Sequence, residues 1–317
     1  MQKRTLGNSG IEVPPLCFGC NVFGWTVDDS TGFQLLDALV TAGLNFLDTA
    51  DVYSRWAPGN SGGESETLIG NWLKQRGSRD KVIIATKVGM DMGRGKKGLK
   101  GSYIMQAVED SLRRLQTDYI DLYQSHVDDQ ETPLEETLAA YDQLIKAGKV
   151  RAIGASNYDA GRFAHALRIS EENGLSRYES LQPNYNLYDR AGFEAELEPL
   201  CLEKGIGVIN YFSLAKGFLT GKYRSEADLT QSPRGVGVKQ YLNDRGFRIL
   251  AALDHVAEES NSTPTSAALA WQIARPSVTA PIASATSLEQ LNDLIAATRL
   301  DLDSEAIETL NRASGYE

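Results

Sequence analysis

The sequence is poor in cysteine, which limits how the chain can be held together. Its cysteines are Cys17, Cys20 and Cys201, an odd number with no pair of CxxC units. A disulfide framework, or a zinc site made of such units, is therefore not expected. We expect all three cysteines to be small core residues of a protein in a reducing compartment.

Histidine is equally scarce. The chain has only His126, His165 and His255, and neither these nor the cysteines show the spacing of metal ligands, so we predict no metal site. His165 and His255 fall within segments of helical periodicity and are expected to be surface or packing residues. His126 differs from them because it ends a short apolar run.

Positive charge and long apolar runs are also lacking. Lys and Arg number 32 against 42 Asp and Glu, a formal net charge of -10, so the chain is not expected to neutralise nucleic-acid phosphates. The N-terminal "MQKRTLGNSGIEV" has no apolar signal-peptide core, and no segment reaches the roughly 18 apolar residues of a membrane span. We predict a soluble, cytoplasmic protein without a nucleic-acid or membrane partner.

What the sequence does contain is a regular alternation of short apolar runs and longer segments of helical periodicity. This pattern is typical of βα units around a parallel sheet. The predicted strands are 16–20, 45–49, 82–88, 120–126, 150–156, 179–185, 207–213 and 278–284. The predicted helices are 31–43, 64–77, 102–116, 133–148, 159–174, 193–205 and 287–298, with a short amphipathic helix within 303–317.

Eight such alternations favour a (β/α)8 TIM barrel, built as a single domain over residues 1–317. An open doubly wound sheet of six or seven strands would give a similar pattern. The segment "TLGNSGIEV" predicts a β-hairpin that closes the bottom of the barrel. The segments 54–63 and 214–243 are longer than simple connections, so we predict extended loops at the C-terminal rim.

Three polar residues end successive apolar runs. Asp48, Lys87 and His126 follow one another at intervals of 39 residues, so a barrel would place them on neighbouring strands at the C-terminal rim. Tyr53 lies in the loop just after Asp48. We expect Asp48 to hold Lys87 and the charge of Lys87 to favour the phenolate of Tyr53. His126 is expected to donate a hydrogen bond to the oxygen on which negative charge develops, or to help orient a carbonyl. A core ion pair beside an ordinary surface tyrosine is the alternative.

Several separated motifs resemble the aldo-keto reductase superfamily, in the family's order and over nearly the whole chain. They are "NFLDTADVYSRWAPGNSGGESETLIGNWLK", "VIIATKVG", "SLRRLQTDYIDLYQSH", "GKVRAIGASNY", "LQPNYNLYDR" and "LAKGFLTGKY". The resemblance implies a (β/α)8 barrel that binds a nicotinamide dinucleotide, usually NADPH. It also implies a catalytic tetrad of Asp48, Tyr53, Lys87 and His126, with Tyr53 as the proton donor.

The dinucleotide would need groups other than a Rossmann phosphate turn, because no GxGxxG follows a strand. The resemblance assigns the nicotinamide amide to Ser156, Asn157 and Gln182. Tyr211 would stack on the nicotinamide ring, although a buried aromatic plug would explain this tyrosine almost as well. Backbone amides expected on the pyrophosphate are those of Ser213, Leu214, Lys216, Gly217 and Leu219, with the side chains of Lys222 and Arg234 nearby. The other expected cofactor residues are Cys20, Asn21, Asp48, Ser284, Thr286 and Gln290.

One position departs from the family pattern. Many relatives have an arginine where this chain has Thr286, and that arginine meets the extra phosphate of NADPH. NADPH stays the predicted cofactor, with NADH as the alternative unless Lys222, Arg234 or Lys239 supplies the missing charge. The substrate is predicted to be a small carbonyl compound. Side chains expected to shape its cavity are Trp25, Tyr53, Trp56, Val88, Met90 and Val127.

These observations predict a reversible NADPH-dependent reduction of an aldehyde or ketone to the alcohol. Two other functions stay open. The same barrel in voltage-gated potassium channel β subunits pairs a bound nicotinamide with a regulatory partner, so a redox sensor is one. An aldolase-like barrel with Lys87 as a Schiff-base amine is the other. The sequence does not specify the oligomeric state.

Overall fold

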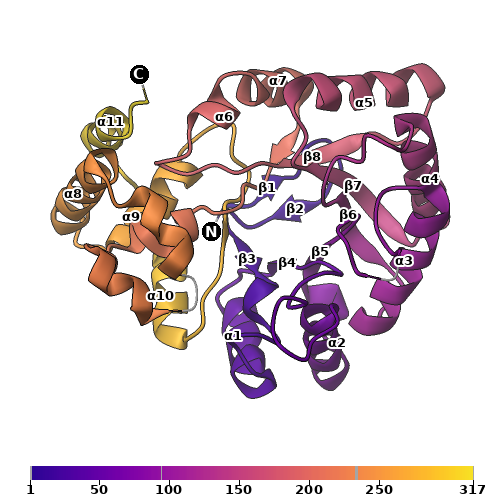
Figure 1. The fold of residues 1–317 in the computed structure, drawn as a ribbon, viewed down its shortest axis with the longest axis horizontal. Helices are drawn as coiled ribbons and strands as arrows, with labels where there is room; N and C mark the ends of the chain where they lie inside the picture. Colours follow the sequence, from indigo (N-terminus) through magenta and orange to yellow (C-terminus); the bar gives the residue numbers. More distant parts are fainter. Residues whose placement is uncertain (1, 94, 233–234, 317) are drawn as a thin grey trace.

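The computed structural model describes residues 2–93, 95–232 and 235–316. Within these residues, eight parallel strands form one sheet in the order β10-β3-β4-β5-β6-β7-β8-β9 (Figure 1). The strands are β3 (Cys17–Gly19), β4 (Phe46–Asp48), β5 (Ile83–Val88), β6 (Ile120–Ser125), β7 (Val150–Ser156), β8 (Tyr178–Gln182), β9 (Gly207–Val208) and β10 (Ile282–Ala283). Consecutive strands up to β9 are therefore neighbours in space, as the alternation of strands and helices predicted.

Backbone hydrogen bonds also join the two strands at the ends of this order. The amide of Thr279 donates to the carbonyl of Val208 at 2.8 Å, and the amide of Ile282 donates to the carbonyl of Asn210 at 2.9 Å. The β9 and β10 segments thus meet and close the sheet into a barrel. The predicted (β/α)8 barrel is confirmed, and the alternative of an open doubly wound sheet is wrong.

The helices lie around the outside of the strands (Figure 1). They are α1 (Asp29–Thr41), α2 (Glu64–Arg76), α3 (Gly101–Leu115), α4 (Leu134–Lys146), α5 (Ala160–Asn173), α6 (Ala191–Glu194), α7 (Leu197–Lys204), α8 (Asp244–Glu259), α9 (Pro264–Ile273), α10 (Leu288–Ala297) and α11 (Ser304–Ala313). Side chains such as Asp28, Asp159 and Ser287 accept a hydrogen bond from an amide in the first turn. These N-caps explain why the helices begin where they do.

The N-terminal hairpin closes one end of the barrel. Strand β1 (Arg4–Thr5) pairs antiparallel with β2 (Glu12–Val13), as predicted. The buried side chains of Leu6, Ile11 and Val13 pack in one cluster with inward-facing strand residues. The strand residues and neighbours in that cluster are Cys17, Phe46, Ala85, Leu122, Ala152, Ile209, Ala280 and Ile282. This end is filled with apolar side chains, so the polar site must lie at the other end.

The structure differs from the predicted elements in two helical regions. The predicted helix 193–205 is divided into α6 and α7. Pro199 has no amide hydrogen and is tolerated only in a first turn, which requires a new helix to begin close before it. Helices α8 and α9 were not predicted; they lie between the predicted helices 193–205 and 287–298. The loop 214–243 holds short 3-10 helices, η3 (Ala215–Thr220), η4 (Glu226–Gln231) and η5 (Gly235–Tyr241), where an extended loop was predicted.

The last two strands are shorter than predicted. Strand β10 covers two residues of the segment 278–284, and β9 covers two of 207–213. Pro281 lacks the amide that a regular ladder needs. The amide of Val208 donates to the side-chain hydroxyl of Thr279 at 3.1 Å. A side-chain oxygen thus accepts the hydrogen bond that a backbone carbonyl would accept in a regular ladder.

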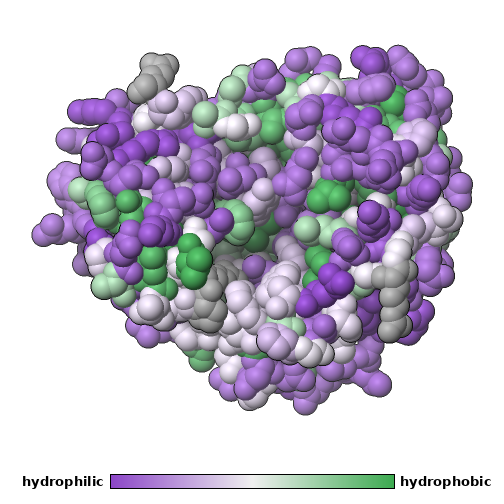
Figure 2. Space-filling model, viewed as in Figure 1, coloured by the Kyte–Doolittle hydropathy of each residue, from purple (hydrophilic) through white to green (hydrophobic). Residues whose placement is uncertain are grey.

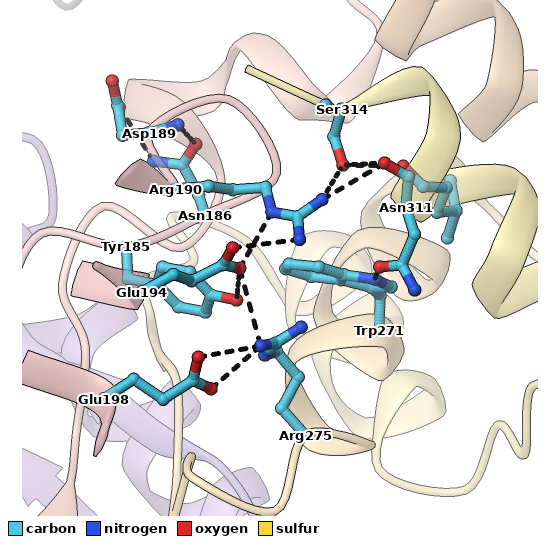
Figure 3. Close-up of polar contacts among 12 residues, drawn as sticks. Tyr185, Asn186, Asp189, Arg190, Glu194, Glu198, Trp271, Arg275, Asn311 and Ser314 are labelled. Carbon is cyan, nitrogen blue, oxygen red and sulfur yellow. Dashed lines mark hydrogen bonds and ion pairs between the residues drawn. The ribbon is translucent and has the colours of Figure 1, made fainter. Parts of the chain in front are cut away.

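A cluster of ion pairs fastens the C-terminal helix to the barrel (Figure 3). Arg190 forms an ion pair with Glu194 at 2.8 Å and donates to the hydroxyl of Ser314, also at 2.8 Å. The indole of Trp271 donates to the side chain of Asn311 at 2.9 Å. These contacts connect α6, α9 and the end of α11, so the cluster has a structural role.

The scarce residues lie where the sequence suggested. Cys17, Cys20 and Cys201 are all buried free thiols. His165 is exposed on α5, and His255 on α8 forms a surface pair with Glu259. In the described part of the chain, no helix is long and apolar enough to cross a membrane.

Candidate functional site

The face seen in Figure 1 is hollowed near its middle (Figure 2). The predicted polar residues lie at the C-terminal ends of the strands, opposite the hairpin. Asp48 is the last residue of β4, Lys87 is the fifth of six residues in β5, and His126 directly follows β6. Side chains alternate between the two faces of a strand, so Asp48 faces the barrel interior like Phe46, and Lys87 like Ala85.

The ammonium group of Lys87 joins Asp48, Thr49 and Tyr53 through hydrogen bonds. It donates to Asp48 Oδ2 at 2.7 Å, to the backbone oxygen of Thr49 at 2.8 Å and to Tyr53 Oη at 2.7 Å. The side chains of Lys87 and Asp48 are 0% and 1% exposed. Three acceptors for three ammonium protons satisfy a charge that would otherwise be costly to bury. The structure therefore brings Asp48, Lys87 and Tyr53 together.

Asp48 is held on its other side by two glutamines. Its Oδ1 accepts from Gln182 Nε2 at 3.0 Å and from Gln124 Nε2 at 3.4 Å. Gln182 was expected at the nicotinamide, whereas Gln124 was not predicted. The signal was available, because Gln124 lies two residues before His126 and strand residues two apart share a face.

The proton of Tyr53 is held more tightly than the sequence suggested. Burial first, and then the negative charge of Asp48, raise the pKa of Tyr53 well above its usual value. Its hydroxyl also lies 3.3 Å from Asp48 Oδ2. The expected effect of Lys87, which favours the phenolate, stays a prediction, and burial together with Asp48 outweighs it in the net pKa. Tyr53 is thus a neutral phenol at neutral pH.

His126 lies beside the phenol as a neutral ring. Its ring meets that of Tyr53 edge-on, with the centroids 5.8 Å apart. Burial first, and then the charge of Lys87, lower the pKa of His126 well below its usual value. Within the described residues, its buried Nδ1 has no hydrogen-bond partner. An unpartnered acceptor costs less than an unpartnered N–H, so we assign the proton to Nε2.

Comparisons with known proteins agree with this geometry. The sequence profile described as "Aldo/keto reductase family" matches residues 15–314. The chain belongs to the aldo/keto reductase family. It is 34% identical to the "Uncharacterized oxidoreductase YrpG" of Bacillus subtilis (strain 168), over 98% of this chain and 95% of that protein.

Two further relatives indicate the range of this family. The norsolorinic acid reductase of Aspergillus flavus is 30% identical, with 99% of this chain and 81% of that protein covered. A probable voltage-gated potassium channel subunit beta of Arabidopsis thaliana is 32% identical, with 92% and 90% covered. This aldo/keto reductase is accordingly an NAD(P)H-dependent oxidoreductase.

The residues expected at the nicotinamide amide form one connected group. Asn157 directly follows β7, and its Nδ2 donates to the backbone oxygen of His126 at 2.9 Å and to Ser156 Oγ at 3.1 Å. The hydroxyl of Tyr211 donates to Asn157 Oδ1 at 2.8 Å. The Tyr211 ring is partly exposed, so it is not a buried plug. Asn157 is therefore bonded to the backbone of His126, and Ser156 and Tyr211 are joined to the tetrad through Asn157.

The loop after β9 has an unusual backbone. Phe212, Ala215 and Lys216 have positive φ angles of 53°, 47° and 58°. Non-glycine residues in this region are strained and collect at ligand sites. The amides of Gly217 and Leu219 already donate to the carbonyl of Leu214, at 2.8 and 3.2 Å. Of the amides expected at the pyrophosphate, those of Ser213, Leu214 and Lys216 are therefore the better candidates.

Several of the other expected cofactor residues are hydrogen-bonded to one another. Ser284 Oγ donates to Asn21 Oδ1 at 2.8 Å. The amide and hydroxyl of Thr286 donate to Gln290 Oε1 at 2.9 and 3.1 Å. Lys222 is exposed. Lys239 forms an exposed ion pair with Glu226, and Arg234 lies outside the described residues.

The structure changes one of the expected contacts. Val88 is fully buried in the main core cluster, and it follows the inward-facing Lys87, so its side chain points away from the site. Cys20 is also fully buried, and its expected contact with the cofactor stays a prediction. Trp56 and Met90 are exposed, while Trp25 and Val127 are partly exposed. Within the described residues, no group of three or more His, Cys, Asp or Glu could hold a metal ion.

Asp51, three residues after Asp48, was not singled out from the sequence. Its side chain is buried, and neither carboxyl oxygen has a hydrogen-bond partner among the described residues. Burial first, and then the charge of Glu66, raise the pKa of Asp51 to about 8, against the lowering effects of Arg114, of the nearby backbone amide of Val52 and of Lys87. The Asp51 amide donates to the carbonyl of Lys87 at 3.3 Å, so this neutral carboxyl lies directly behind the site.

Replacing Asp51 with asparagine should make the stability of this reductase less sensitive to pH. The folded-state pKa of about 8 lies above the unfolded value, so native Asp51 binds a proton that the unfolded chain releases. The free energy of unfolding should then fall by up to about 1.4 kcal/mol per pH unit between roughly pH 4 and pH 8. Asp51→Asn has no such titrating group and lacks this loss. In urea unfolding at pH 5, 6, 7 and 8, the free energy of unfolding of the variant should therefore rise relative to that of the wild type as pH rises.

Asp37→Asn is the matched control. Its hydrogen bond with Arg76 lowers the pKa of Asp37, so this group stays ionised throughout that pH range. The stability difference between Asp37→Asn and the wild type should therefore be flat from pH 5 to 8. A flat difference for Asp51→Asn as well would show that Asp51 is already charged at pH 5.

Proposed function

We propose that this reductase converts an aldehyde or ketone to the alcohol with NADPH, and that Tyr53 supplies the proton. The observation that supports this most is the neutral phenol whose oxygen lies 2.7 Å from the buried ammonium of Lys87. Such a phenol can donate its proton, and the ammonium stabilises the phenolate that remains. Asp48 keeps the ammonium in position.

A bound nicotinamide supplies the hydride. As the new C–H bond forms, the electron pair of the carbonyl π bond moves to the oxygen, which takes the proton of Tyr53. The Nε2–H of His126 would donate to the same oxygen and stabilise its growing negative charge. The reverse reaction begins with the Tyr53 phenolate removing the alcohol proton.

NADPH is the proposed cofactor, in preference to NADH. Ser156, Asn157, Gln182 and Tyr211 would hold the nicotinamide, and the strained loop 212–217 would hold the pyrophosphate. Lys239 is paired to Glu226. We therefore propose that Lys222, which is exposed, contacts the extra phosphate of NADPH. The single domain over residues 1–317 and the cytoplasmic location also remain proposals.

Two other functions deserve comparison. The similarity to a protein named as a potassium channel subunit beta favours a redox sensor with little turnover as the second candidate. A Schiff-base aldolase is less consistent with the geometry. An amine needs a free electron pair to attack a carbonyl, whereas Lys87 donates hydrogen bonds to Asp48, Thr49 and Tyr53.

The proposal is tested by following absorbance at 340 nm with NADPH and with NADH against aliphatic, aromatic, sugar and pyridoxal-type carbonyls. We expect turnover with at least one class and a higher kcat/KM for NADPH. Retention of NADPH without turnover of any carbonyl would instead support the sensor. A higher kcat/KM with NADH would overturn the proposed role of Lys222. Borohydride trapping of a substrate on the protein would support the aldolase.

A further inference from the structure

Two tryptophans from different rim loops form a wall beside Tyr53. The rings of Trp25 and Trp56 meet edge-on, with the centroids 5.7 Å apart and the planes at 88°. Trp56 also lies edge-on to Tyr53, at 6.0 Å and 62°. We call Trp25 and Trp56 the aromatic wall. It continues directly into the Tyr53 and His126 rings of the proposed catalytic site.

The loops that hold the aromatic wall are bonded to each other. Asn60 Nδ2 donates to the carbonyl of Gly24 at 2.7 Å and to that of Ser54 at 3.0 Å. Ser54 Oγ donates to the carbonyl of Phe23 at 2.5 Å. Both loops are thereby fixed to one another close to their tryptophans. The two tryptophans of the aromatic wall are therefore held at fixed positions relative to each other, although they come from different loops.

Ser54 shows that this geometry is maintained against strain. It has a φ of 71°, which is unfavourable for a residue with a Cβ, and it is fully buried between Tyr53 and the loop of Trp56. Such strain persists only where surrounding contacts impose it, and it collects at functional sites. The bond to Phe23 is one of these contacts. Tyr53 and Trp56 are therefore positioned together.

The wall presents apolar surface that the folded chain leaves in water. Trp56 is 49% exposed, although large apolar side chains are normally buried where possible. A ligand ring packed on a preformed surface would bury this area without the usual cost of ordering the side chains. Tyr53 is the polar group next to the wall, so a carbonyl attached to such a ring would lie beside the phenol.

We propose that the aromatic wall selects aryl aldehydes and aryl ketones as substrates, an inference that rests on the proposed function of Tyr53. Aromatic rings attract one another in edge-on and offset arrangements beyond the effect of the area they bury. A saturated ring of similar size would bury comparable surface without this attraction. The sequence placed Trp25 and Trp56 only near the cavity, and their mutual packing becomes visible in the structure.

The test compares benzaldehyde with cyclohexanecarboxaldehyde, which has a saturated ring of similar size. The ratio of their kcat/KM values is measured for the wild type, Trp56→Leu and Trp56→Phe, so that the different reactivities of the two aldehydes cancel between variants. Trp56→Leu should lower the aryl-to-alkyl ratio about 3- to 10-fold, and Trp56→Phe should give an intermediate ratio. Phe247→Leu on α8, which changes a 40% exposed aromatic residue outside the proposed site, is the matched control and should leave the ratio unchanged.

A binding measurement separates this inference from the proposed function. Benzamide and cyclohexanecarboxamide are titrated against the protein with bound NADP⁺, and tryptophan fluorescence is followed. The wild type should bind benzamide more tightly, and Trp56→Leu should lose this preference. An unchanged aryl-to-alkyl ratio in Trp56→Leu overturns the inference. If the wild type reduces neither aldehyde and no other carbonyl of the panel, but Trp56→Leu loses the preference for benzamide, the proposed function fails and the aryl site stands. If that preference is also unaffected, both are wrong.

Discussion

Tyr53→Phe should lower kcat for carbonyl reduction by about 10²- to 10⁴-fold, the usual contribution of a general acid. The substitution removes the hydroxyl that lies 2.7 Å from Lys87 Nζ. It keeps the ring, which packs edge-on against Trp56 and has the Lys87 ammonium 4.4 Å from its centroid. Binding of NADPH, measured by titration calorimetry, should therefore change little, and the loss should appear in single-turnover hydride transfer at 340 nm.

Tyr119→Phe provides a control for this substitution. Tyr119 directly precedes β6 at the hairpin end of the barrel, and its ring lies 3.7 Å from the guanidinium of Arg79. Phenylalanine preserves that ring contact, so kcat should stay at the wild-type value. If Tyr53→Phe also reduced carbonyls at the wild-type rate, another group would have to supply the proton.

Lys87→Met should lower kcat by at least about 10²-fold, an effect of the size seen when a stabilising donor is removed from a site of developing charge. Without the ammonium, the phenolate of Tyr53 has no positive neighbour at hydrogen-bond distance. The pKa of the phenol, already raised by burial and by Asp48, should therefore rise further. Oxidation of the alcohol needs the phenolate, so the rising limb of its pH-rate profile should move to higher pH. An unmoved limb would contradict the electrostatic role of Lys87.

The same substitution should also destabilise the protein, and a double variant separates the two effects. Lys87→Met leaves the buried carboxylate of Asp48 without its ion-pair partner, which typically costs about 3–5 kcal/mol. Asp48→Asn combined with Lys87→Met removes both charges, so most of the free energy of unfolding should return. Turnover should stay low in both variants. Recovery of turnover along with stability would show that Lys87 is only a structural residue.

Local sequence patterns were enough to predict most of the barrel. Strands such as β5 and β6 are short segments built on Ile, Val, Leu and Tyr, and helices such as α2 and α3 have clear periodicity and glycine or basic residues at their ends. The regular interval between Asp48, Lys87 and His126 follows from the repeated βα unit. This interval alone predicts that these residues share one rim of the barrel.

The elements that were predicted too long or were missed depend on contacts distant in the sequence. Strands β9 and β10 lie within predicted strands but are shorter, because Pro281 and the Thr279 side chain interrupt the ladder, where Val208 bonds to Thr279 71 residues away. The helices α8 and α9 follow the long loop after β9 in the chain. Periodicity reports only how residues close together in the chain alternate. It therefore does not show which strands and helices after the long loop complete the barrel.

The net pKa of Tyr53 illustrates the same limit within the site. The sequence placed an ammonium and a carboxylate near the phenol, but the sign of their combined effect depends on burial, which no spacing shows. Asp51 was likewise given no role, because its lack of a hydrogen-bond partner exists only after the strands and helices have packed. Gln124 was missed although its position two residues before His126 indicated the shared strand face.

The sequence by itself determined the βα alternation, the identity of the Asp, Tyr, Lys and His side chains and their positions at strand ends, because these are properties of neighbouring residues. Only the tertiary structure decided how far Lys87 lies from Tyr53, that the phenol keeps its proton, and that Trp25 and Trp56 stand together beside it. Distances and burial are set only when residues far apart in the chain pack into one interior. Water is excluded there, so the low dielectric strengthens the effect of each charge on the groups packed against it.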